Sequence, residues 1–191
     1  MGEKLTLKDL LYGLMLRSGN DAAVVIAKNI AGNMDNFAML MNETADKIGM
    51  ENSYFYNAHG LEESDGTGNL STAYDMALLT KYAMQNDIFK EIFKTKNYQV
   101  KTNKKSYSWT NKNKLLHNYE FITGGKTGFT QKARRTLVTT ASSNNIDLVI
   151  VTLNDPNDFN DHLNLYESTF RNYKALKVLD KNKFIIKNDT E

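Results

Sequence analysis

The spacing of apolar residues changes near residue 85, and this change constrains the fold more than any other feature of the chain. Before it, apolar residues recur every three or four positions, as along one face of a helix. After it, β-branched residues gather in short runs at 135–141 and 146–153, which is typical of strands. Helices first, strands next and a closing helical stripe predict an α+β fold, with an antiparallel sheet packed with helices.

Capping and breaking residues predict where the helices begin and end. Thr6 starts a variant of the capping box and opens a helix whose apolar face begins at Leu7. Gly19 interrupts that helix, and a second is expected from Ala22 to Ala31, capped by Asn20 or Asp21. Residues 50–70 are expected to be irregular, and two further helices are predicted by the stripe Phe37, Leu40, Met41, Ala45 and Ile48 and by the segment Thr72 to Met84.

The second half predicts a hairpin, two longer strands and a closing helix. Short strands are expected around Tyr98-Gln99-Val100 and Tyr107-Ser108-Trp109, on either side of a polar turn. Ser142-Ser143-Asn144-Asn145 is a hairpin signal between the two β-branched runs. One last strand is expected from Lys183 to Lys187, and the closing helix from the stripe Phe159, Leu163, Tyr166, Phe170 and Tyr173.

Composition limits the class of function without choosing one. With 191 residues, 41% of them hydrophobic, the chain fits one domain, and a net charge of +2 gives no overall field for nucleic acid. The absence of cysteine excludes disulfides, thiolate metal sites and a cysteine nucleophile. His59, His117 and His162 are too scattered for a metal triad, so they are expected to be structural or surface residues, with no metal or other cofactor. No apolar run is long enough to span a membrane, and no signal peptide is visible at Met1.

Lys126-Thr127-Gly128 is the most informative short motif of the chain. It would give a strand a cation, a hydrogen-bonding hydroxyl and a place where another backbone can approach, which suits an enzyme that binds a peptide ending in a carboxylate. Ser18-Gly19-Asn20 lies far upstream, between two predicted helices. Each triplet alone is better explained as a turn or a connection between helices, so the two gain meaning only together.

Together the triplets resemble the signature of the serine penicillin-recognising enzymes, which consists of Ser-x-x-Lys, Ser-x-Asn and Lys-Thr-Gly elements. The chain is most similar to the D-alanyl-D-alanine carboxypeptidase branch, the low-molecular-mass penicillin-binding proteins of the serine β-lactamase-like superfamily. The resemblance implies a β-lactamase/transpeptidase-like fold and an extracytoplasmic place in the cell envelope of a bacterium. It covers nearly the whole chain and is carried by the stretches Asp9–Ala23, Asn57–Leu61, Ser71–Ala77 and Gly125–Thr130.

One element of the signature is missing, because no serine of the chain is followed by a lysine three residues later. In the family this element precedes Ser-x-Asn, and only seventeen residues precede Ser18. The chain is therefore expected to be an N-terminally truncated carboxypeptidase domain over residues 1–179, without its nucleophile and inactive alone. Residues 180–191 are expected to start a C-terminal β-rich domain or tail, and any membrane anchor would lie in segments that the chain lacks.

The resemblance implies catalytic roles for Ser18, Asn20 and Lys126. Ser18 would relay a proton or hold the catalytic lysine of the missing element, and Asn20 would hydrogen-bond that lysine or the substrate backbone. Lys126 would supply positive charge for the substrate carboxylate.

The resemblance also implies three substrate-binding residues. Thr127 would hydrogen-bond the substrate carboxylate, and Gly128 would leave room for a peptide that docks along the strand edge as an added strand. The backbone N–H of Phe129 would be one of two oxyanion donors, the other belonging to the missing nucleophile.

The implied reaction is removal of the terminal D-alanine from peptidoglycan stem peptides that end in D-Ala-D-Ala, through an acyl-enzyme, with β-lactam antibiotics as inhibitors. A β-lactamase is an alternative within the enzymes. A non-catalytic module that binds cell-wall peptide or penicillin is an alternative outside them, and the missing Ser-x-x-Lys favours it. A fragment that depends on a partner to fold is a third alternative.

Two further features stand out. Seven lysines surround Tyr98, Tyr107 and Trp109, and they are Lys94, Lys96, Lys101, Lys104, Lys105, Lys112 and Lys114. Such a pattern suits single-stranded nucleic acid, an anionic cell-wall polymer or a solvated hairpin face; the solvated face is preferred here, so no nucleic-acid partner is predicted. Arg134 departs from the family, in which a small residue, commonly glycine, is expected after Lys-Thr-Gly.

Overall fold

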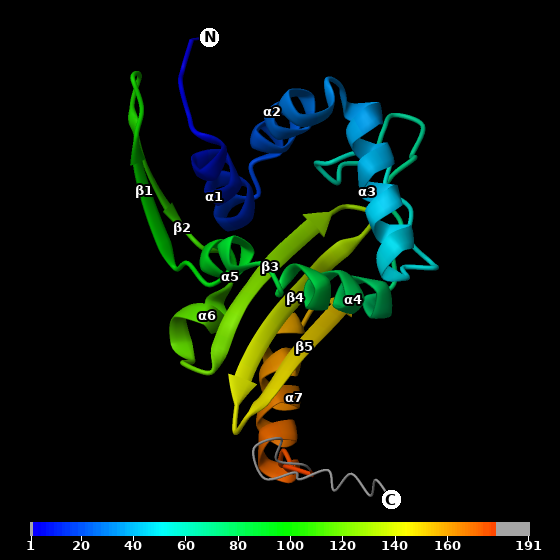
Figure 1. The fold of residues 1–191 in the computed structure, drawn as a ribbon, viewed down its shortest axis with the longest axis vertical. Helices are drawn as coiled ribbons and strands as arrows, with labels where there is room; N and C mark the ends of the chain where they lie inside the picture. The colour runs from blue at the N-terminus through cyan, green and yellow to red at the C-terminus, as the bar shows by residue number, and fades with distance from the viewer. Residues whose placement is uncertain (1, 179–191) are drawn as a thin grey trace, which may run out of the picture.

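The computed structural model describes residues 2–178 and has three layers (Figure 1). The central layer is an antiparallel sheet in the order β3-β4-β5, formed by β3 (Ile122–Thr130), β4 (Arg134–Ser143) and β5 (Ile146–Leu153). Helices α4 (Ala73–Ala83) and α5 (Asp87–Phe93) cover one face, and α7 (Asp158–Asn172) covers the other. The α+β prediction with an antiparallel sheet packed with helices is therefore confirmed.

The first three helices, α1 (Leu7–Arg17), α2 (Asn20–Ala31) and α3 (Met34–Ile48), form an arc beyond one end of the sheet (Figure 1). The capping box at Thr6 is present, and Gly32 and Gly49 end the second and third helices with positive φ, as predicted. The predicted start of the second helix at Ala22 is wrong. The helix begins at Asn20, and its N-cap residue is Gly19, which has no side chain to cap it. Since α1 ends at Arg17, only Ser18 and Gly19 separate the two helices.

The predicted hairpin is formed by β1 (Asn97–Lys101) and β2 (Ser106–Thr110), which pair antiparallel. The turn between β4 and β5 places Asn144 and Asn145 at φ 53° and 61°, the mirror-image geometry that matches the twist of the strands. Helices α5 and α6 (Lys114–Asn118) were not predicted, because seven and five residues are too few to show a helical stripe. The strand expected at Lys183–Lys187 and the domain start expected at 180–191 lie outside the described residues.

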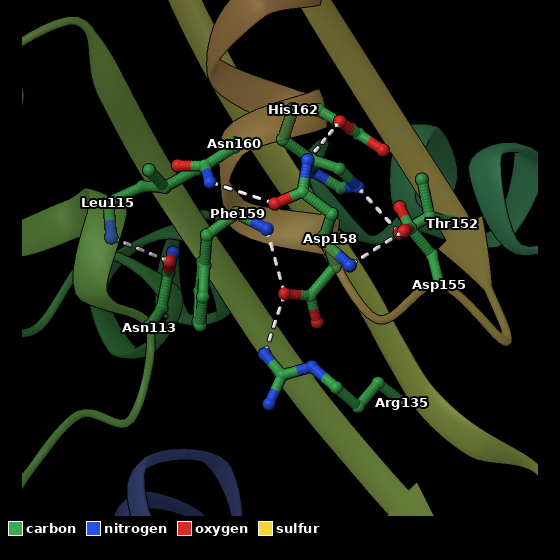
Figure 2. Close-up of polar contacts among 11 residues, drawn as sticks. Asn113, Leu115, Arg135, Thr152, Asp155, Asp158, Phe159, Asn160 and His162 are labelled. Carbon is green, nitrogen blue, oxygen red and sulfur yellow. Dashed lines mark hydrogen bonds and ion pairs between the residues drawn. The ribbon is translucent and has the colours of Figure 1, made fainter.

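The main core lies between α7 and the back of the sheet, and it contains Leu115, Leu116, Ile122, Ala141 and Tyr166. A buried polar row crosses it. His162 bonds the hydroxyls of Thr139 at 2.7 Å and Thr152 at 3.1 Å, and burial lowers its pKa to about 4, so it is neutral near pH 7. Figure 2 shows His162 beside the ion pair in which Arg135 donates to Asp158 at 2.6 Å, so the start of α7 is fixed to β4 and β5.

A second core joins the hairpin to α1. The ring of Tyr98 stacks on Tyr12 with centroids 3.7 Å apart, and Trp109 lies against the backbone of Gly13, where an added Cβ would be 3.2 Å from the indole. Leu16 and Ile92 complete this cluster. The hairpin is therefore attached to the helix that ends at Ser18.

Candidate active site

Ser18 is positioned by the end of α1. It is the C-cap residue, its N–H donates to the carbonyl of Leu14 at 2.9 Å, and its φ of 60° lies in the left-handed region. A residue other than glycine pays about 1 kcal/mol or more for that conformation, and such residues gather at functional sites. The half-buried hydroxyl of Ser18 is thus held by a strained helix end rather than by a mobile loop.

Lys126 lies in the middle of β3, where it pairs with Val138 of β4. Its Nζ donates to Ser18 Oγ at 2.6 Å and to the carbonyl of Thr127. No carboxylate in the described residues pairs with it. Burial, and then repulsion from Lys112, lower the pKa of Lys126 from 10.5 to about 8, so roughly nine-tenths of it stays charged at pH 7.

The first triplet therefore meets the second through Ser18 and Lys126, which are 108 residues apart in sequence. Asn20 is the first residue of α2, and its side chain is exposed. Over residues 2–178 that side chain makes no hydrogen bond, so the structure places Asn20 two residues from the contact without joining it to either partner.

The other residues of the Lys-Thr-Gly segment follow along β3. Gly128 faces Thr136 across the strands, and the Thr136 hydroxyl occupies the space that a Cβ would need. The neighbouring strand by itself therefore requires a glycine at position 128. Thr127 is half-buried, and the side chain of Phe129 is 61% exposed. In the described part of the chain β3 pairs only with β4, so its other edge is free to accept an extended peptide.

Two glycines before Lys126 bring β3 close to the residues that support it, a role that the sequence did not indicate. An added Cβ on Gly124 would overlap the ring of Phe93, and one on Gly125 would overlap the amide of Asn113. The fully buried Asn113 also caps α6 and donates to the carbonyl of Gly124 at 3.3 Å. An asparagine two residues before the apolar pair Leu115-Leu116 was the available signal, because asparagine favours helix N-caps.

The irregular segment 50–70 reaches the far end of β3. Thr130 donates to Glu62 at 2.6 Å, and Lys132 donates to the carbonyl of Gly66 at 2.9 Å. His59 lies in the same segment and accepts a hydrogen bond from the N–H of Leu61 at 3.2 Å. The Asn57–Leu61 stretch is therefore carried close to the end of the Lys-Thr-Gly strand.

Arg134 has a φ of 58°, which explains why a glycine was expected there. It follows the turn after β3, and its exposed guanidinium lies 3.5 Å from the side-chain oxygen of Gln131. Arg134 contacts neither Ser18 nor Lys126. The arginine that replaces the expected small residue therefore affects the turn after β3 and not the contact between Ser18 and Lys126.

A cavity of about 860 Å³ lies elsewhere, between α4, the end of α5 and the sheet. Its lining includes Leu78, Met84, Ala141, Leu148 and Val149 and is mostly apolar. Neither Ser18 nor Lys126 lines it, so it is separate from the site described above.

Comparisons with known proteins agree with this geometry. The family model for Peptidase S11, D-alanyl-D-alanine carboxypeptidase, matches residues 1–157. The chain is 34% identical over 151 residues to D-alanyl-D-alanine carboxypeptidase DacF of Bacillus subtilis, covering 78% of this chain and 38% of that protein. It is 35% identical over 179 residues to DacC of Escherichia coli, covering 92% of this chain and 43% of that protein. The chain thus spans less than half the length of these two relatives.

Solved structures give the same result. A penicillin-binding protein homolog from Mycobacterium tuberculosis superposes with a TM-score of 0.82 at 29% identity, over 91% of this chain and 68% of that one. A mutant of a Streptomyces DD-transpeptidase gives 0.82 at 30% identity, over 90% and 70%. The transpeptidase-like fold is therefore confirmed. With its Lys-Thr-Gly strand against the serine that ends α1, the chain belongs to the Peptidase S11 family of D-alanyl-D-alanine carboxypeptidases.

Proposed function

We propose that residues 1–179 form the part of a serine D-Ala-D-Ala carboxypeptidase domain that binds and orients the C-terminal end of a peptidoglycan stem peptide. The observation that carries this proposal is the contact between Lys126 and Ser18 at 2.6 Å, in which a half-buried ammonium has no carboxylate partner. A cation held in this way lacks a counter-ion, and the terminal carboxylate of a peptide would supply one.

The proposed reaction is acyl transfer. A serine oxygen would bond to the carbonyl carbon between two D-alanines, the peptide C–N bond would break, and the leaving D-alanine would take up a proton. Water would then hydrolyse the ester and release the shortened peptide. Since Ser18 Oγ accepts a hydrogen bond from Lys126, protons can pass between them, which suits a relay beside the reacting serine.

The remaining roles follow the strand. Thr127 would hydrogen-bond the same carboxylate as Lys126, and the substrate would lie along the free edge of β3 as an added strand. The N–H of Phe129 would donate to the oxyanion, a contact typically worth about 3 kcal/mol in the transition state. Asn20, exposed at the start of α2, is free to bond the substrate backbone.

A second candidate is a binding module without catalysis. It is favoured by the sequence itself, because none of the 191 residues is a serine with lysine three positions later. On either view we expect the 191-residue chain to bind a penicillin or a D-Ala-D-Ala peptide reversibly. Covalent reaction would need a nucleophile that these residues do not supply.

Members of this family act on peptidoglycan peptides in the bacterial cell wall and are generally extracytoplasmic. We propose the same envelope location for this chain, with the stem peptide as substrate and β-lactams as inhibitors. Among residues 2–178, no helix is both long and apolar enough to cross a bilayer.

The test uses intact mass and calorimetry on the same protein. We expect no mass increase after incubation with a penicillin, and measurable binding of a diacetyl-Lys-D-Ala-D-Ala peptide at pH 7. Replacing Lys126 by methionine should weaken that binding at least tenfold. The affinity of the parent should also fall as the pH rises through about 8, because the ammonium loses its proton there.

The matched control is Lys28→Met, an exposed lysine on α2, which should bind as the parent does. A peptide with an amidated C-terminus should bind the parent only weakly. Its affinity for the Lys126→Met variant should be no lower than its affinity for the parent. If Lys126→Met weakened the binding of the carboxylate peptide and of the amidated peptide by the same factor, recognition of the carboxylate by Lys126 would be refuted. A covalent penicillin adduct would show that a serine or threonine of this chain is a competent nucleophile.

A further inference from the structure

The segment from Lys94 to Lys114 carries a concentrated positive charge. It contains seven lysines and neither aspartate nor glutamate, so it contributes +7 to a chain whose net charge is +2. The other residues therefore sum to −5. Such a separation of charge creates a local field that the small net charge conceals.

All seven lysines are exposed, and within residues 2–178 none forms an ion pair. The hairpin projects from the body of the molecule beside α1 (Figure 1), so solvent surrounds most of it. Glu3 accepts hydrogen bonds from the hydroxyls of Thr102 and Tyr107, and Asp9 accepts one from the hydroxyl of Tyr98. Glu91 interacts with Lys94, and Glu3 and Asp21 interact with Lys105, so carboxylates offset only part of the positive charge. A polyanion would relieve the repulsion that remains.

One face of the hairpin presents hydrogen-bonding side chains beside these lysines. The pairs Asn97–Thr110, Gln99–Ser108 and Lys101–Ser106 lie across the two strands, and all six side chains are exposed. Hydroxyl and amide groups donate to neutral oxygens, and ammonium groups attract phosphate as point charges. The face therefore suits a polymer that carries both phosphate and hydroxyl groups.

The aromatic residues of the hairpin are on the opposite face and are engaged in packing. Tyr98 stacks on Tyr12 at 3.7 Å, and Trp109 lies 6.1 Å from Tyr98 and 5.1 Å from Tyr107 between ring centroids. They are unavailable as platforms on which nucleic-acid bases could stack. The exposed face also has no apolar side chain that could insert into a membrane.

We propose that the β1–β2 hairpin and the lysines at its base form a docking surface for a linear phosphodiester polymer of polyol units. The lysines at the turn, Lys104 and Lys105, and those at the base, including Lys96 and Lys112, are about 15 Å apart along the strands, estimated from five residues of strand. A single polymer chain can contact both groups at once. This surface is independent of the proposed acyl transfer, because binding to it requires neither Ser18 nor Lys126.

The test measures binding of the 191-residue protein to inorganic polyphosphate and to a poly(glycerol phosphate), from 50 to 200 mM salt. We expect binding that weakens steeply with salt, since each phosphate contact contributes about 0.7 to the slope of log K against log salt for a single-stranded polyanion. The triple variant Lys96→Gln, Lys101→Gln, Lys104→Gln should bind at least tenfold more weakly, and its slope should be smaller by about 2. Urea unfolding midpoints show that the variant is folded.

The control triple variant changes three exposed lysines outside the hairpin, Lys28, Lys47 and Lys174, to glutamine and keeps the same net charge. It should bind within twofold of the parent. Equal losses in the two triple variants would overturn the proposal, because net charge alone would then account for binding. Tighter binding to oligo-dT, to poly-glutamate or to vesicles of anionic lipid, at equal concentration of charge, would overturn it in favour of that partner.

Discussion

Burial of the Lys126 ammonium should lower the stability of the fold near pH 7 and make that stability depend on pH. Its pKa is lowered from 10.5 to about 8, chiefly by burial, and a shift of this size corresponds to a penalty of about 3 kcal/mol for keeping the ammonium charged near pH 7. Methionine has a similar length and no charge, so Lys126→Met removes that penalty. It also loses the hydrogen bonds that the ammonium donates to Ser18 and to the Thr127 carbonyl, at about 1.5 kcal/mol each. The two effects nearly cancel, so we expect the stability of Lys126→Met to lie within about 1 kcal/mol of the parent at pH 7.

The pH dependence identifies the cause. A basic group whose folded pKa lies below its unfolded pKa makes the unfolded state bind more protons between the two values, so stability rises with pH between about 8 and 10.5. The penalty is complete below pH 8 and fades above it. At pH 10 the parent should therefore gain about 2 kcal/mol of stability relative to Lys126→Met, leaving the variant the less stable protein.

The assay is urea unfolding of parent and variant at pH 7 and pH 10, followed by circular dichroism. Exposed Lys28→Met is the matched control and should differ from the parent by less than about 0.5 kcal/mol at both pH values. A difference in stability between Lys126→Met and the parent that is the same at pH 7 and at pH 10 would refute the assignment of a desolvated, unpaired ammonium.

Three further predictions concern a close contact of β3, the turn after it and the ion pair at the start of α7. Gly124→Ala should cost about 2 to 3 kcal/mol in urea unfolding, since its Cβ overlaps the Phe93 ring; adding Phe93→Leu should restore part of that loss, and simple additivity would argue against the overlap. Arg134→Gly should raise stability by up to about 1 kcal/mol, because φ is 58° there, and a clear loss would contradict the strain. Asp158→Asn should cost about 2 kcal/mol by weakening the bond to Arg135, and an unchanged thermal midpoint would show that this pair contributes little.

Local structure was readable wherever it depends on neighbouring residues. The capping box at Thr6, the helix ends at Gly32 and Gly49, and the mirror-image turn at Asn144 follow from side chains within a few positions. The short α5 and α6 were missed because their stability comes from packing. Phe93 lies under Gly124, and the cap of α6 bonds to β3, which are contacts with distant segments.

The sequence by itself determined the order of helices and strands and the two triplets that indicated the family, because periodicity, caps and motif letters are local properties. Only the tertiary structure decided that Ser18 meets Lys126, that Asn20 contacts neither, and that Lys112 comes near enough to Lys126 to lower its pKa. Distances between remote segments, and the desolvation that sets a pKa, depend on how the whole chain packs. The same packing placed the aromatic side chains of the hairpin against α1 and left its lysines in solvent. Composition alone could not show which of these side chains are buried and which are exposed.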